Sequence, residues 1–87
     1  MILPPGFAVK VEDVPPGVFT ARFVRDGRRI TFLVNDGLEP AKATVRTTAG
    51  GTLTADLFDP LAGTVTPVQV PGILSVEPYS SLLIVER

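Results

Sequence analysis

The side chains that could do chemistry in this sequence are nine acidic residues and three serines, because the chain contains neither histidine nor cysteine. Without histidine, the commonest general base and metal ligand is missing, and no Ser-His-Asp arrangement can form. Ser75, Ser80 and Ser81 therefore lack a base that would activate a hydroxyl. The lack of cysteine removes thiol nucleophiles, thiolate metal sites and disulfides. These absences predict that the chain by itself is not an enzyme, and that it has no catalytic residues.

The acidic residues favour turns over a reaction site. Hydrolysis of a glycosidic bond needs two carboxylates at a defined separation. Asp26, Asp36 and Asp59 each precede a glycine or a proline, where an aspartate side chain accepts hydrogen bonds from the local backbone. A calcium site formed by Asp36 with Asn35 or Asp59 is an alternative, although the spacing matches no EF-hand loop. We expect no metal and no cofactor.

Charge and aromatic content give few indications of a ligand. Arg22, Arg25, Arg28 and Arg29 surround Asp26, but the net charge is −1 and no aromatic ladder accompanies them, so a solvated hairpin tip is favoured over a nucleic-acid site. The chain has no tryptophan and a single tyrosine, Tyr79, for which a packed corner is favoured over a sugar platform.

The N-terminus carries no evident targeting signal. Its apolar segment MILPPGF is too short for a signal peptide or a membrane span. We expect no membrane partner, and the localisation stays open between the cytoplasm and secretion as part of a longer chain.

The elements that must position these residues are strands. Valine, isoleucine and threonine make up more than a quarter of the 87 residues, and nine prolines and eight glycines leave no window for a stable helix. Residues 19–35 form the strongest signal, two alternating strands joined at Asp26-Gly27, which suits a type I′ turn. Further strands are expected at 7–11, 41–46, 52–58, 64–70, 73–76 and 81–86.

These strands indicate an all-β fold. We predict one domain over residues 1–87, a two-sheet antiparallel β-sandwich of about eight short strands with Greek-key connections. Residues 1–17 form a proline-rich lead-in with an edge strand, since proline is tolerated mainly at sheet edges. The last strand is expected to be buried on both faces because 82–85 is a continuous apolar run.

Alternation divides the hairpin into two faces. The aromatic face is expected to build the core; it consists of Phe19, Phe23, Phe32 and Val34. Val24 and Leu33 are expected on the opposite face, in contact with a partner. Apolar residues at outward positions suggest that a partner covers one sheet: Val24, Leu33, Val68 and Val70.

Three segments resemble a known family when they are taken in order. They are 18–35, with Arg22 on its first arm and ITFLVN on its second; 57–63, LFDPLAG; and 76–85, VEPYSSLLIV. Together they resemble the small β-sandwich domains that follow the catalytic barrel in α-amylase-type, α-L-rhamnosidase-type and β-galactosidase-type glycoside hydrolases. The resemblance covers residues 18–86. It implies a non-catalytic accessory domain that packs against and stabilises a catalytic domain, and it carries over no catalytic residue.

The implied partner is the catalytic domain of the same or a longer chain, from which this domain would be excised. Two alternatives remain: a carbohydrate-binding module and an immunoglobulin-like interaction domain of a surface protein. A carbohydrate, and in isolation a second copy of the chain, are the other partners considered, while nucleic acid is not expected. The candidate contact residues are Tyr79, Leu33 and Val24.

Overall fold

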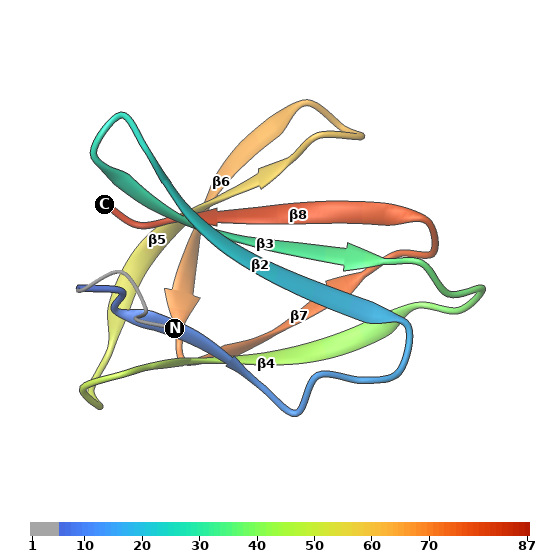
Figure 1. Cartoon of the computed structure of the whole chain (residues 1–87), viewed down its shortest axis with the longest axis horizontal. Coiled ribbons are helices and arrows are strands. Elements are labelled where there is room, and N and C mark those ends of the chain that lie inside the picture. Colours follow the sequence, from blue (N-terminus) through green and yellow to red (C-terminus); the bar gives the residue numbers. More distant parts are fainter. Residues whose placement is uncertain (1–5) are drawn as a thin grey trace.

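The computed structural model describes residues 6–87, which form eight strands in two antiparallel sheets (Figure 1). The three-stranded sheet has the order β1 (Val9–Glu12), β4 (Ala41–Thr47), β7 (Gly72–Val76). The five-stranded sheet has the order β2 (Val18–Arg25), β3 (Arg28–Asn35), β8 (Ser80–Val85), β5 (Leu53–Asp59), β6 (Thr64–Val70). The predicted all-β sandwich is confirmed. Of the predicted lead-in, residues 1–5 lie outside the described part of the chain.

The predicted hairpin is the pair β2 and β3. Asp26 and Gly27 both have positive φ, 52° and 76°, as a type I′ turn requires. The ladder runs without a bulge from Arg25 opposite Arg28 to Val18 opposite Asn35. The two-residue turn therefore fixes the register over the full length of both strands.

The order of the strands follows the expected connections. In the run from β5 to β8, the fourth strand returns to lie beside the first, which is typical of Greek-key sandwiches. As predicted, β1 is an edge strand; β8 lies inside the other sheet, between β3 and β5. The burial of β8 is less complete than predicted, because Leu82 and Ile84 are buried whereas Leu83 and Val85 are only half-buried.

The core lies between the two sheets and is aliphatic. Its main cluster comprises Val9, Val18, Leu33, Val45, Ala55, Val70, Leu74, Val76, Leu82 and Ile84. The predicted faces of the hairpin are therefore wrong: Leu33 is fully buried, while Phe19 is 63% exposed and Phe23 is exposed as well. Val70 also belongs to the core and Val68 packs against it, so neither is an outward residue.

Asn35 gives the physical reason for this reversal. Its buried side chain donates to the carbonyls of Glu39 (2.8 Å) and Val76 (2.9 Å) and accepts from the Gly37 N–H (2.9 Å). Because Val76 belongs to the other sheet, the bond forms only when Asn35 points inward. Alternation then turns Leu33 inward and Phe32 outward.

The C-terminal end ties the two sheets together near β1. The buried carboxylate of Glu86 accepts hydrogen bonds from the backbone N–H groups of Ala8 and Val9, at 3.1 to 3.3 Å. The Glu86 N–H in turn donates to the Arg29 carbonyl (3.0 Å). Within residues 6–87, no helix is long and apolar enough to cross a membrane.

Candidate interaction surface

The outer side of the five-stranded sheet carries the largest group of outward apolar side chains. Register aligns one row across all five strands, namely Ala21, Phe32, Leu83, Phe58 and Val65. Neighbouring rows add Phe19, Val34, Phe23, Ile30, Val85 and Pro67. We call these eleven residues the apolar face. Five strands spaced about 4.8 Å apart and five residues of about 3.4 Å each give an outline of roughly 400 Å², which also contains the polar Ser81 and Asp56.

A patch of this size is informative. The largest apolar patch on a typical monomeric protein covers roughly 300 to 600 Å² and often has a function. Within the apolar face, Phe19 and Val65 are each 63% exposed, and Phe23 is exposed at the edge of the sheet. Phe32 and Phe58 are half-buried, and Ala21 and Pro67 are exposed. The arrangement can bury aromatic surface against another molecule.

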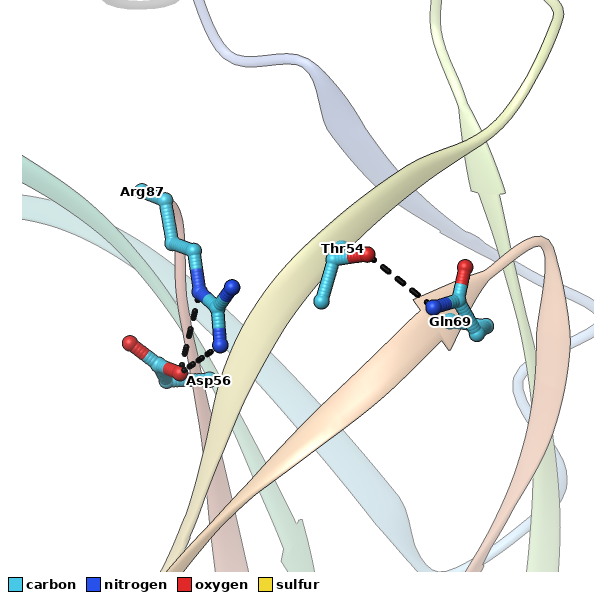
Figure 2. Close-up of polar contacts among 4 residues, drawn as sticks. All are labelled: Thr54, Asp56, Gln69 and Arg87. Atoms are coloured by element: carbon cyan, nitrogen blue, oxygen red, sulfur yellow. Dashed lines mark hydrogen bonds and ion pairs between the residues drawn. The ribbon is translucent and has the colours of Figure 1, made fainter.

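A polar corner borders the apolar face near the place where β5 begins and β6 ends. Figure 2 shows its four side chains; Thr54 and Gln69 are register partners on β5 and β6, Asp56 also lies on β5, and Arg87 follows β8. Arg87 donates to the Asp56 carboxylate (2.9 and 3.2 Å), and Gln69 donates to the Thr54 hydroxyl (3.0 Å). The contacts are exposed, so they form a polar rim of the kind that surrounds the buried centre of an interface.

Basic residues border the apolar face at the β2–β3 turn. Arg25 and Arg28 are paired there, and both are exposed. Arg22, on the inner side of β2, places its guanidinium 5.5 Å from the centre of the Phe7 ring. The end of the sheet that carries this turn is thus positively charged.

The outer side of the three-stranded sheet is polar by contrast. The Glu12 carboxylate lies 3.0 Å from the Lys10 ammonium and 2.8 Å from the Arg46 guanidinium. The hydrogen bond from Lys10, with the nearby charges of Lys10 and Arg46, holds the pKa of Glu12 below its ordinary value of 4.5. Ile73 is a large apolar side chain exposed on this side. One sheet therefore presents a solvated face and the other an apolar one.

The three predicted contact residues occupy different places. Leu33 is fully buried in the core and cannot contact a partner, which corrects its predicted role. Val24 is 51% exposed near the end of β2, on the inner side of that strand. Tyr79 is 68% exposed in the turn before β8 and has a φ of 55°. Its ring does not pack as a corner residue, so that interpretation is wrong.

The predicted turn roles of the aspartates hold for Asp59. Its side-chain oxygen accepts from the N–H groups of Leu61 (3.0 Å) and Ala62 (3.3 Å). Asn35 uses its side-chain groups inside the fold, so it does not supply an oxygen to a calcium ion beside Asp36. Across residues 6–87, no three carboxylate, histidine or cysteine side chains gather in a way that could hold a metal ion.

A shallow recess of about 230 Å³ lies at one end of the three-stranded sheet. It is lined by Lys10, Arg46, Thr47, Gly50, Gly51 and Pro71. Both of its cationic side chains are already paired with Glu12. The recess therefore offers little uncompensated charge for an anion.

The sequence contained a signal for the apolar face, because apolar residues occur on both sides of the two hairpin strands. The prediction took the aromatic side of the hairpin as the core. It therefore placed the exposed surface on the opposite side of the sheet. In comparisons with known proteins, no family model, no curated protein and no solved structure matches this chain.

Proposed function

We propose that the chain is a non-catalytic β-sandwich module that packs the apolar face of its five-stranded sheet against another protein domain. The observation that carries this proposal is the asymmetry between its two outer surfaces. One has the ion-paired Lys10, Glu12 and Arg46, whereas the other exposes phenylalanine side chains. A domain that worked alone would be expected to have both surfaces solvated.

The partner that the sequence resemblance implies is the catalytic domain of a glycoside hydrolase. The residues that carry the resemblance have structural positions that suit a packing role. Asp59 closes the β5–β6 turn, Phe58 belongs to the apolar face, and Leu82 and Ile84 fill the core. On this proposal the catalytic carboxylates lie on the partner, and this domain stabilises it.

The test needs the catalytic barrel whose reading frame is continuous with this chain. The barrel and the chain are purified separately, and their association is measured by isothermal titration calorimetry. We expect binding that weakens at least tenfold when Phe19→Thr and Phe23→Thr are introduced together. The matched control is Ile73→Thr, which removes an exposed apolar side chain from the other sheet and should bind normally.

Three results would contradict the proposal or a part of it. Equal binding by the double variant and the control would show that the apolar face is not the contact surface. If no barrel is encoded with the chain, the proposal that the partner is a glycoside hydrolase is wrong. The apolar face could then still pack against a different protein domain. Hydrolysis of aryl glycosides by the purified chain would overturn its non-catalytic role.

Tyr79 supports a second candidate, a carbohydrate-binding module. A non-glycine residue with positive φ is uncommon, and here it holds an aromatic ring in solvent. An exposed ring of this kind can stack on a sugar. Calorimetry with soluble polysaccharides would detect such binding, and Tyr79→Ala should abolish it if the ring is the platform. No heat of binding with any polysaccharide would remove this candidate.

A further inference from the structure

The free edge of β2 is a second surface with unused bonding capacity. β2 lies at one edge of the five-stranded sheet, and within residues 6–87 it pairs only with β3 (Figure 1). Arg25 and Arg28 flank a two-residue turn, so they form a hydrogen-bonded pair, and such pairs alternate along the ladder. The backbone groups of Phe23, Ala21 and Phe19 therefore bond to β3.

The intervening residues turn their backbone groups the other way. By this alternation the N–H and C=O groups of Thr20, Arg22 and Val24 point away from β3. The hydrogen bond from Asp36 N–H to the Gly17 carbonyl (2.8 Å) fits the same phase at the far end of the ladder. Within residues 6–87, the outward N–H and C=O groups of Thr20, Arg22 and Val24 make no hydrogen bond. They provide three donors and three acceptors in a row.

The other edges are protected in ways that β2 is not. β6 contains Pro67, which cannot donate to a ladder, and β1 is only four residues long and carries Lys10 and Glu12. β7 has five residues and directly follows Pro71. By comparison, β2 has eight residues with no proline and no bulge, and its two charged residues, Arg22 and Arg25, are both basic. An edge of this kind accepts an added strand.

Charge indicates what kind of strand would bind. Residues 18–29 contain Arg22, Arg25, Arg28 and Arg29 but only one acidic residue, Asp26. A second copy of β2 would bring two such basic segments together, which is electrostatically unfavourable. An acidic segment would instead place a carboxylate beside Arg22 in the added ladder. Opposite charges paired across neighbouring strands are stabilising, and like charges are destabilising.

We propose that the free edge of β2 binds an extended acidic segment of another protein as an additional antiparallel strand. Alternate side chains of that segment are apolar and lie beside Phe19 and Phe23, where they extend the apolar face by one strand. The side chains between them are acidic and lie on the side of Arg22. The added strand would border the apolar face at Phe19 and Phe23, and it differs from the contact proposed above because it bonds to the backbone groups at the edge of β2.

The probe is an acetylated and amidated eight-residue peptide that alternates valine with glutamate, and its control replaces each glutamate by lysine. Amide hydrogen exchange is followed by NMR. We expect the glutamate peptide to slow exchange of the Thr20, Arg22 and Val24 amides at least tenfold, and the lysine peptide to have no effect. In Arg22→Glu, the preference should pass to the lysine peptide. Equal protection by both peptides, or none by the glutamate peptide, would overturn the proposal.

Proline substitution separates the edge from the fold. Thr20→Pro removes an outward N–H, so the ladder with β3 is retained while peptide binding should fall at least tenfold. If this variant does not fold, Val24→Pro tests the same point nearer the end of the strand. Binding that survives either folded variant contradicts the proposal. A dimer that forms as the protein concentration rises, and that protects the same three amides without any peptide, would also contradict the proposal. The strand bound at the edge would then be a second copy of the chain.

Discussion

At the scale of single residues, Leu33 and Phe32 are neighbours with opposite roles. Leu33 is fully buried among core side chains, whereas Phe32 lies on the apolar face and is half-buried. Removing a buried leucine side chain leaves a cavity and costs about 2 to 5 kcal/mol. We therefore expect Leu33→Ala to lower the free energy of unfolding by that amount, and Phe32→Ala to lower it clearly less.

Urea denaturation of the two variants at micromolar concentration measures the difference. The comparison requires the monomer, because a partner on the apolar face would add stability that depends on Phe32. A larger loss in Phe32→Ala than in Leu33→Ala would contradict the inward assignment of Leu33.

Glu12 predicts a dependence on pH. Its pKa is lowered in the folded state by Lys10 and Arg46, so the folded chain binds the proton more weakly than the unfolded chain. This contribution to stability is present above the ordinary value of 4.5 and is lost as the pH falls through the folded-state pKa. We expect Glu12→Gln to be less stable than the wild type at pH 7 and equal to it near pH 2 in thermal melts. A difference that is the same at both pH values would show that the ion pairs do not cause it.

At the scale of elements, the sequence was sufficient to predict local features such as turns and edge strands. It was insufficient to predict which side of the hairpin points into the core. The β2–β3 turn follows from Asp26-Gly27, because few other dipeptides accept two positive φ values. The position of β1 at an edge follows from the prolines around it. The direction in which the hairpin faces depends instead on Asn35 bonding to Val76, 41 residues away. Alternation alone could not reveal that contact, since both sides of the hairpin are apolar enough to form a core.

The same limit applies to the candidate surfaces. Exposed arginines around Asp26 were evident from the sequence, but the unpaired edge beside them depends on strand order. Tyr79 was expected to pack as a corner residue, whereas its ring is exposed in a turn where its φ is 55°. In both cases the residue type was informative and its surroundings were set by distant parts of the chain.

The attachment of β1 gives a prediction for an element. Glu86 accepts the N–H groups of Ala8 and Val9 at the start of this strand, and β1 pairs with β4 over only four residues. Glu86→Ala should leave these buried donors without a partner, at a cost of about 1 to 3 kcal/mol. In this variant we expect hydrogen exchange, measured by NMR, to accelerate more for the β1 amides than for the β3 amides. Uniform acceleration in both strands would indicate that the carboxylate stabilises the whole fold and not β1 in particular.

At the scale of the whole molecule, an 87-residue chain has little apolar surface to spare. Domains of about 60 residues bury only about 60% of the surface that their unfolded chains expose, and the fraction rises slowly with size. The main core cluster of this chain is aliphatic, whereas four of its five phenylalanines lie on the apolar face and only Phe7 is buried. Its stability as a monomer should therefore be modest, and it should increase when the apolar face is covered.

The apolar face can be tested without knowing its partner. The double variant Phe19→Thr, Phe23→Thr replaces exposed rings by a residue that suits strands, so the unfolding temperature should change by only a few degrees. Because less apolar surface remains, binding of an apolar fluorescent dye and association at high concentration should both decrease. Ile73→Thr, on the polar side of the molecule, should change neither property. If the double variant instead lost as much stability as Leu33→Ala, the two rings would belong to the core and the surface proposed for the partner would not exist.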